Sequence, residues 1–461
     1  MVDVLWGLGG MVVVLAIAVA FSVDRRAIRL RTVAGALALQ VGFAVVVLYW
    51  PAGQRALEVV SDGVQAAIGA SRDGIEFVFG PALPAEGVVF AFQVLPVIIF
   101  FAALTSVLYH LGALQQVVRV IGGGLAKALG TTRPESMNAA ANIFVGQTEA
   151  PLVIRPYVAG MTRSELFAVM VGGLSTVAGS VLVGYALLGA QLEYLLAASF
   201  MAAPAALLMA KLVFPEGAAD TRRRPGSEKT RRRRWSEKLR LRRGEQAEMA
   251  ARPADSAAAT DDAAAPLDDN TRDEHAPAAE QRGATTDVLK HRNVIDAAAA
   301  GASDGLHLAL NVGAMLIAFI ALVALLNLLL GAVGGLFGVD DLTFEQILGW
   351  VFAPLMFLVG VPWAEAVPAG SFIGQKVVLN EFVAFSNFGP VVETFSTKAQ
   401  AVITFALTGF ANLGSLAILL GGLGGIAPER RSDIAQLGLR AVLCGTLANL
   451  MSAAIAGILI G

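Results

Sequence analysis

The feature that most constrains this chain is a series of apolar segments, each about long enough to cross a lipid bilayer and almost free of charge. A spanning helix needs about 20 consecutive apolar residues, and Val4–Val23, Val33–Trp50 and Val88–Tyr109 meet or approach that length. Only 15% of the residues are charged, against about 25% in soluble domains. The pattern predicts an all-α polytopic membrane protein lying in a lipid bilayer.

About eight transmembrane helices are expected, and basic residues indicate their direction. The eight segments are Val4–Val23, Val33–Trp50, Val88–Tyr109, Leu166–Leu188, Leu195–Leu212, Leu308–Phe337, Ala399–Ile426 and Val442–Ile460. Because arginine-rich loops stay in the cytoplasm, the loop 25–31 after the first helix places both termini outside. Ala52–Gly80 carries charges and has apolar residues at helical spacing, which indicates a helix lying along the interface.

Composition excludes several classes of function. The net charge of −2 gives no field for a nucleic acid polymer, and the single cysteine, Cys444, cannot form an intrachain disulfide. The four histidines have no metal-ligand spacing, which argues against a soluble metalloenzyme. Residues 215–292 are basic and then acidic, with too little apolar surface to offset the entropy of ordering, so we expect a disordered cytoplasmic loop.

Two further segments are too polar for lipid-facing helices and too apolar for loops. Ser136–Tyr157 carries Glu149 at its centre, and Pro368–Phe395 carries Glu381. A charge at membrane depth costs several kcal/mol and usually faces a partner or a water-filled cavity. Irregular backbone is tolerated there only where it is buried in protein or lines such a cavity. Both segments are therefore predicted to be re-entrant helical hairpins whose polar tips meet inside the protein.

Each hairpin is followed by an apolar helix that glycine and polar residues interrupt, at Gly172–Ser180 and again at Gly409–Ser415. By the expected order of spans, the first of these helices runs outward and the second inward. This is the pattern of an inverted repeat, which places substrate and ion sites at discontinuous segments near the midplane. Chance similarity between two apolar halves is the alternative.

Several of these motifs resemble the concentrative nucleoside transporter family, and the likeness covers most of the chain apart from the polar loop. Gly374-Gln375-Lys376-Val377-Val378-Leu379-Asn380-Glu381-Phe382-Val383-Ala384-Phe385 is similar to its signature. Further similar stretches are 146–151, 178–181, 293–318 and 409–412. The resemblance implies a homotrimer in the bacterial inner membrane, where the direction indicated by the basic loops makes both termini periplasmic. It also implies elevator-type nucleoside import with a cation, commonly Na+ and in some bacterial members H+.

The resemblance also implies a division into a scaffold and an inverted-repeat transport domain. Residues 1–112 would be scaffold and interfacial helices, and 113–214 the first repeat, with hairpin 133–160, broken helix 164–189 and helix 195–214. After the loop 215–292, residues 293–362 would hold an amphipathic segment, scaffold helix 308–337 and an interfacial helix. Residues 363–461 would form the second repeat, with hairpin 365–395, broken helix 399–426 and helix 440–461.

Eight substrate-binding residues follow from the resemblance. In the first hairpin Gln147, Thr148 and Glu149 would face the base, and Val181 would pack on it. Glu381, Asn412 and Ser415 would hold the ribose hydroxyls, since a carboxylate accepting from a hydroxyl makes a strong bond, and Phe410 would wall the pocket. Glu149 and Glu381 could instead be structural, paired with Arg155 and Lys376. The preference for purine or pyrimidine stays open.

Four residues match the family's sodium site by position, with Na+ as coupling ion and no other cofactor implied. Asn142 and Thr176 would supply side-chain oxygens, and Val145 and Val177 backbone carbonyls, a ligand set that suits a hard cation. Capping of broken helix ends by Asn142 and Thr176 is the alternative, and proton coupling would then replace sodium. Two other functions stay open: an intramembrane hydrolase that uses the paired carboxylates, and a receptor or scaffold with a cytoplasmic signalling loop.

Overall fold

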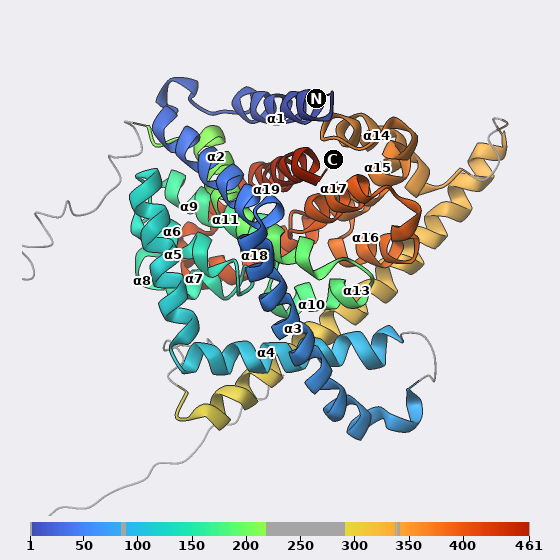
Figure 1. Cartoon of the computed structure of the whole chain (residues 1–461), viewed down its shortest axis with the longest axis horizontal. Coiled ribbons are helices and arrows are strands. Elements are labelled where there is room, and N and C mark those ends of the chain that lie inside the picture. Colours follow the sequence, from blue (N-terminus) through green and yellow to red (C-terminus); the bar gives the residue numbers. More distant parts are fainter. Residues whose placement is uncertain (1, 84–88, 218–290, 337, 339–341, 461) are drawn as a thin grey trace, which may run out of the picture. The chain divides into compact units, whose positions relative to one another are not determined.

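The computed structural model describes residues 2–83, 89–217, 291–336, 338 and 342–460. Every regular element in these ranges is helical, which confirms the all-α class (Figure 1). Six helices in the described ranges are long and apolar enough to cross a membrane, or seven if one sharply bent pair is a single span. The loop expected over 215–292 lies, except at its two ends, outside the described residues.

The first five helices form the N-terminal third of the described chain. They are α1 (Val2–Ala20), α2 (Leu30–Ala44), α3 (Pro51–Phe79), α4 (Leu95–His110) and α5 (Ala113–Leu129). The long helix α3 begins with a proline, whose fixed φ and missing N–H suit the first helical turn. It buries Gly53, Leu57, Ser61, Ser71 and Ile75, a single stripe at helical spacing. This amphipathic pattern is the one that the sequence predicts for residues 52–80.

The next six helices contain the first hairpin and the first broken helix. They are α6 (Arg133–Ala141), α7 (Ala150–Val153), α8 (Arg155–Val158), α9 (Arg163–Ser175), α10 (Gly179–Leu187) and α11 (Leu192–Val213). The returning arm of the hairpin is two single turns, α7 and α8, because Pro151 and Pro156 cannot donate the hydrogen bonds of a continuous helix. Between α9 and α10 the backbone is extended at Thr176 and Ala178, so the helix is interrupted inside the candidate span Arg163–Leu187.

The remaining helices contain the second hairpin and the second broken helix. They are α13 (Val294–Leu336), α14 (Phe344–Leu358), α15 (Trp363–Val378), α16 (Glu381–Phe388), α17 (Thr397–Leu407), α18 (Leu413–Ile426) and α19 (Arg431–Ile460). The bend between α14 and α15 is 117°. One expectation needs correction: α13 is a single helix of 43 residues, so no break separates the amphipathic segment from the helix expected over 308–337. Hydropathy detects only the apolar part of a helix that continues past it.

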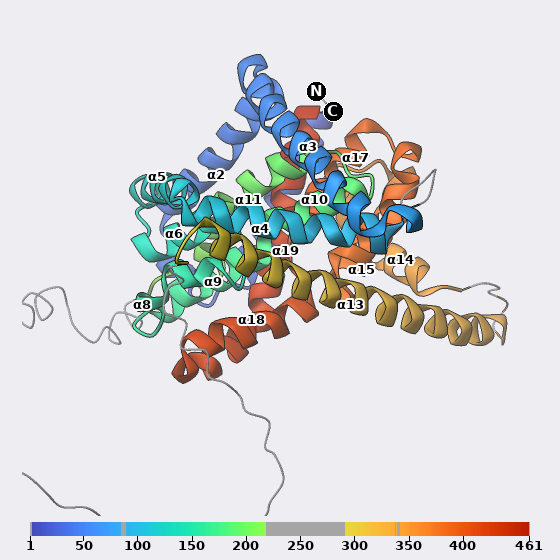
Figure 2. The same cartoon turned by 90° about the horizontal axis from the view of Figure 1, so that it is seen from below.

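Packing separates the helices into two groups. The four helices α9, α11, α17 and α19 pack on one another, with α1 lying on α19 and α2 on α11; Gly7 faces Ile458, so the chain's two ends lie together (Figures 1 and 2). By contrast α4 pairs with α13, where Gly301 and Gly305 bring the two backbones close. Only 6% of the apolar window of α13 is buried, against 94% for α9 and α10.

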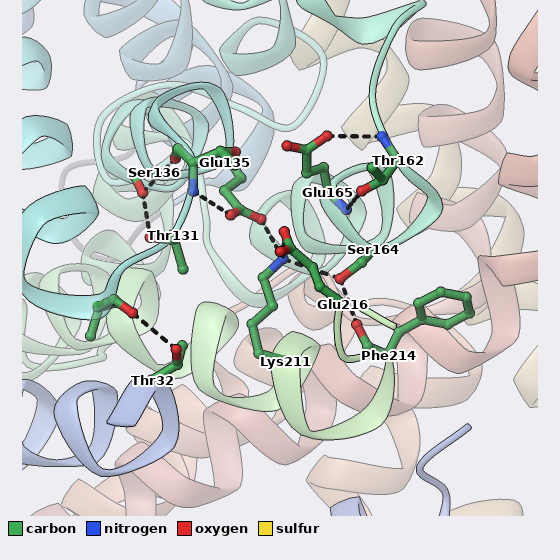
Figure 3. A network of polar contacts seen from close by, with 12 residues as sticks. Thr32, Thr131, Glu135, Ser136, Thr162, Ser164, Glu165, Lys211, Phe214 and Glu216 are labelled. Carbon is green, nitrogen blue, oxygen red and sulfur yellow. Dashed lines mark hydrogen bonds and ion pairs between the residues drawn. The ribbon is translucent and has the colours of Figure 1, made fainter. Parts of the chain in front are cut away.

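A buried ionic cluster fastens the base of the first hairpin (Figure 3). Thr132 and Glu135 form a capping box at the start of α6, and Lys211 Nζ lies 2.6 Å from Glu135 Oε2. Lys211 also donates to Ser164 Oγ at the start of α9, at 3.1 Å, and pairs with Glu216 at 3.5 Å. The ammonium thereby joins the hairpin to the broken helix that follows it.

The second repeat has a corresponding clamp. Glu365 in the first turn of α15 accepts hydrogen bonds from the backbone N–H and the hydroxyl of Ser396, which caps α17. In both repeats a glutamate at the base of the hairpin thus connects to the start of the following broken helix. This likeness supports the repeat that the sequence indicates.

Replacing Lys211 with methionine is expected to lower the thermal unfolding midpoint in detergent by about 5 °C or more, because the buried carboxylate of Glu135 loses its cationic partner. Arg29→Gln is the matched control. Arg29 pairs with Glu216 at 3.7 Å, but its side chain is 62% exposed, and exposed pairs contribute less than about 1 kcal/mol. Equal midpoints for the two variants would contradict a stabilising role for the buried cluster.

Candidate functional site

The interruptions of the two broken helices touch each other. The backbone N–H of Phe410, between α17 and α18, donates to the carbonyl of Thr176, between α9 and α10, at 3.1 Å. The first hairpin reaches the same place, because Gly179 N–H donates to the carbonyl of Phe144 at 3.1 Å. Gly409 has φ +153 and packs against Asn449, where no larger residue fits. Unwound backbone from both repeats is therefore buried at one point, as discontinuous transporter helices require.

Glu381 lies at the tip of the second hairpin and is 4% exposed. It begins α16, whose preceding residue, Asn380, caps the helix by accepting from Val383 N–H at 2.9 Å. Its two carboxylate oxygens accept from Tyr185 Oη at 3.0 Å and from Asn412 Nδ2 at 2.7 Å. A carboxylate offers about four lone-pair positions, so two acceptor positions stay open for ligand hydroxyls.

Tyr185 is a site residue that the sequence reasoning missed. Its ring is fully buried, stacks on Phe385 with centroids 4.4 Å apart, and meets Phe382 at 4.8 Å. These contacts from the second hairpin fix the ring on α10 and aim its hydroxyl at Glu381. A tyrosine within an apolar run was the available signal, because a buried phenol generally needs a hydrogen-bond partner.

The three predicted ribose-binding residues, Glu381, Asn412 and Ser415, lie together where the tip of the second hairpin meets the start of α18. Asn412 caps α18 by accepting from Ser415 N–H at 2.7 Å, so its amide both orders the helix start and donates to Glu381. Ser415 is buried beside it, and Phe410 is half-buried at the interruption. Val181 is buried in the first turn of α10. Glu381 does not pair with Lys376, contrary to the structural alternative, since its oxygens bond to Tyr185 and Asn412.

The predicted base-facing residues occupy the tip of the first hairpin. Gln147 is buried against Gly173 of α9, and its Oε1 has no partner among the described residues. Thr148 lies against Gly422 of α18. Glu149 is exposed and accepts from Gly146 N–H at 3.4 Å; no ion pair in the described ranges joins it to Arg155. Among the described residues, no hydrogen bond links this tip to Glu381.

The four predicted cation ligands lie where the first hairpin meets the break between α9 and α10. Asn142 is fully buried and donates to the carbonyl of Asn138 at 2.9 Å, while its Oδ1 finds no described partner. No donor in the described ranges bonds to the carbonyls of Val145 and Val177. The Thr176 hydroxyl donates to the carbonyl of Gly172 at 2.8 Å. The lone pairs of the hydroxyl oxygen therefore stay available to a cation. A hard cation prefers such uncharged oxygens, so the residues present fit one.

Comparisons with known proteins agree on one family. Families described as "Na+ dependent nucleoside transporter" match at their C-terminal part over residues 194–457 and at their N-terminal part over 9–82, and a "Nucleoside recognition" family matches 91–192. The chain is 53% identical to the uncharacterized transporter YutK of Bacillus subtilis, over 99% of this chain and 100% of that one. It is 43% identical to the nucleoside permease NupC of Helicobacter pylori, over 99% and 98%.

A solved structure extends the likeness to three dimensions. The transporter CNTnw, in an inward-facing substrate-bound state, superposes with a TM-score of 0.82 at 47% identity, over 99% of this chain and 98% of that chain. The likeness therefore covers both hairpins, both broken helices and the helices around them. On the family matches, the identities and this superposition together, the chain belongs to the concentrative nucleoside transporter family.

Proposed function

We propose that this protein imports nucleosides across the bacterial inner membrane by cation symport, with the substrate held between the two hairpin tips. The observation that carries the proposal is Glu381: a buried carboxylate, oriented by Tyr185 and Asn412, that keeps acceptor positions for vicinal hydroxyls. A few well-placed polar groups among apolar side chains are typical of small-molecule recognition. Gln147, Thr148 and Glu149 would then read the base and Val181 would pack on it. Ser415 would bind the ribose with Glu381, and Phe410 would wall the pocket.

Sodium is the coupling ion in this proposal, held by Asn142, Val145, Thr176 and Val177. The unpaired oxygens of Asn142 and of the two valine carbonyls support this choice, because a buried acceptor without a donor is costly unless an ion or water satisfies it. Proton coupling is the competing possibility. The hydrolase considered above is set aside, because the relatives that match are transporters and permeases.

Elevator-type transport needs a moving body and a fixed one, and the packing suggests where they divide. The pair α4 and α13, joined closely at Gly301 and Gly305, is suited to the fixed scaffold, together with α3. Because α1 and α2 lie on α19 and α11, we place these two helices with the moving body, whereas the sequence-based division puts them in the scaffold. The apolar, exposed flank of α13 would contact lipid or the other protomers of a homotrimer.

Uptake of radiolabelled uridine and adenosine into proteoliposomes tests the function. With an inward Na+ gradient at constant pH, accumulation is expected to exceed that in choline at least about 10-fold, the effect of roughly 1.4 kcal/mol of coupling. The same vesicles made leaky with an ionophore serve as control. Accumulation driven only by a pH gradient would keep the transporter and remove sodium, and absence of uptake by folded protein would contradict the substrate.

A further inference from the structure

Lys376 is a fully buried lysine that the transport site described above does not use. It lies in the last turn of α15, at the tip of the second hairpin. Its Nζ donates to the carbonyl of Ala406 at 2.7 Å and to Asn449 Oδ1 at 2.8 Å. No carboxylate in the described ranges forms an ion pair with it. A buried charge normally needs such a partner. Here the two hydrogen-bonded oxygens stabilise the ammonium together with the attraction of Glu381 beyond ion-pair distance.

Ala406 directly, and Asn449 through its own hydrogen bonds, connect Lys376 to the ends of two half-helices. Ala406 lies in the last turn of α17. Asn449, on α19, in turn donates to the carbonyl of Ser175, the last residue of α9, at 2.8 Å, and to that of Thr408 after α17, at 2.6 Å. The C-terminal end of a helix carries partial negative charge and favours a cation. Lys376 and Asn449 together donate hydrogen bonds to the C-terminal ends of both half-helices, α9 in the first repeat and α17 in the second.

Lys376 occupies the place in the second repeat that the proposed cation site occupies in the first. Asn142 precedes Thr162, the N-cap of α9, by 20 residues, and Lys376 precedes Ser396, the N-cap of α17, by the same 20 residues. Each lies where its hairpin meets the end of the following half-helix: Asn142 beside Gly172 and Lys376 against Ala406. In the first repeat the side-chain oxygen of Asn142 is left there without a described partner. In the second repeat the ammonium of Lys376 occupies the corresponding position.

We propose that Lys376 is a tethered cation, which permanently occupies in the second repeat the site where the first repeat binds its exchangeable ion. The inference rests on the proposed cation site at Asn142. It implies that one exchangeable cation per protomer accompanies the substrate, because the second site is already filled. Lys376 is a positioning residue: it orders the break between α17 and α18 from which Asn412 reaches Glu381.

The test compares Lys376→Ala, which empties the position, with Lys376→Met, which fills it with an uncharged chain of similar length. Both are expected to weaken uridine binding in Na+ by about 30-fold or more, the usual effect of losing a charged hydrogen bond. Propylammonium in the buffer should restore binding to Lys376→Ala and leave Lys376→Met unchanged. A purely structural lysine would not produce this selective rescue.

Three results would overturn the proposal. Lys376→Met could bind uridine with wild-type affinity, or propylammonium could change binding equally in both variants. The third is a folded Lys376→Ala protein whose uridine binding propylammonium does not restore. If Lys376→Ala is too unstable for binding assays, its unfolding midpoint becomes the readout, and propylammonium must raise that midpoint selectively. Wild-type protein in the same assay distinguishes the cation site at Asn142 from the proposal for Lys376. Uridine binding that does not depend on Na+ would refute the cation site, whereas rescue by propylammonium tests Lys376 alone.

Discussion

Replacing Glu381 with glutamine is expected to weaken nucleoside binding about 100-fold and to reduce uptake correspondingly. The carboxylate accepts from Tyr185 and Asn412 and has acceptor positions left for a ligand. Glutamine supplies one acceptor oxygen and turns the other position into a donor, which faces either the Tyr185 hydroxyl or the Asn412 amide. A hydrogen bond to a charged group contributes about 1.5–3 kcal/mol, so the loss of its charge and of one acceptor accounts for a factor of this size.

The measurement is equilibrium binding of labelled uridine to purified protein, with uptake in proteoliposomes as a second readout. Glu393→Gln is the matched control, because Glu393 lies at the end of the same hairpin and is exposed. Tyr185→Phe should bind uridine with an affinity between those of Glu381→Gln and Glu393→Gln. It removes one hydrogen-bond donor to Glu381 but keeps the ring stacked on Phe385. Unchanged binding in Glu381→Gln would assign this carboxylate a structural role.

The sequence predicts much of the fold because the bilayer leaves few alternatives. Backbone groups in lipid must be satisfied internally, so each long uncharged run has to be a helix, and six of the eight expected spans are helices of sufficient length. Of the other two, Val4–Ala20 is shorter, and the segment 399–426 is divided by its own interruption. The carboxylates Glu149 and Glu381 indicate the two hairpins for a similar reason, since charge at this depth needs a cavity or a partner.

The partners of these groups could not be predicted in the same way. Tyr185 and Glu381 are 196 residues apart, and Asn449 and Ser175 are 274 residues apart, so no local pattern connects them. The sequence offers Lys376 only as an ion-pair partner of Glu381. Its acceptors in the fold are the carbonyl of Ala406 near the end of α17 and the amide oxygen of Asn449 on α19. A polar residue within an apolar span indicates that a partner exists, and the fold alone identifies it.

Replacing Asn142 with alanine is expected to abolish the stabilisation of the protein by Na+ without lowering its stability in choline. The Oδ1 of Asn142 is buried with no described donor, an arrangement that costs about 1–3 kcal/mol until an ion or water satisfies it. Removing the side chain relieves this cost in the ion-free state, which offsets the loss of its hydrogen bond to the Asn138 carbonyl, and it removes a ligand in the bound state. In the wild type, a ligand present at 100 times its dissociation constant stabilises by about 2.7 kcal/mol.

The unfolding midpoint, measured against Na+ concentration at fixed ionic strength with choline as replacement, shows the effect. Asn387→Ala is the control, because Asn387 is exposed on the second hairpin and its amide donates to Gln375, far along the chain from the proposed cation site. It should keep the wild-type response. If Asn142→Ala still responds to Na+, the cation binds elsewhere. If it instead loses stability in choline, and neither it nor the wild type responds to Na+, the bond of Asn142 to the Asn138 carbonyl at the end of α6 is its whole role, and proton coupling becomes the stronger account of symport.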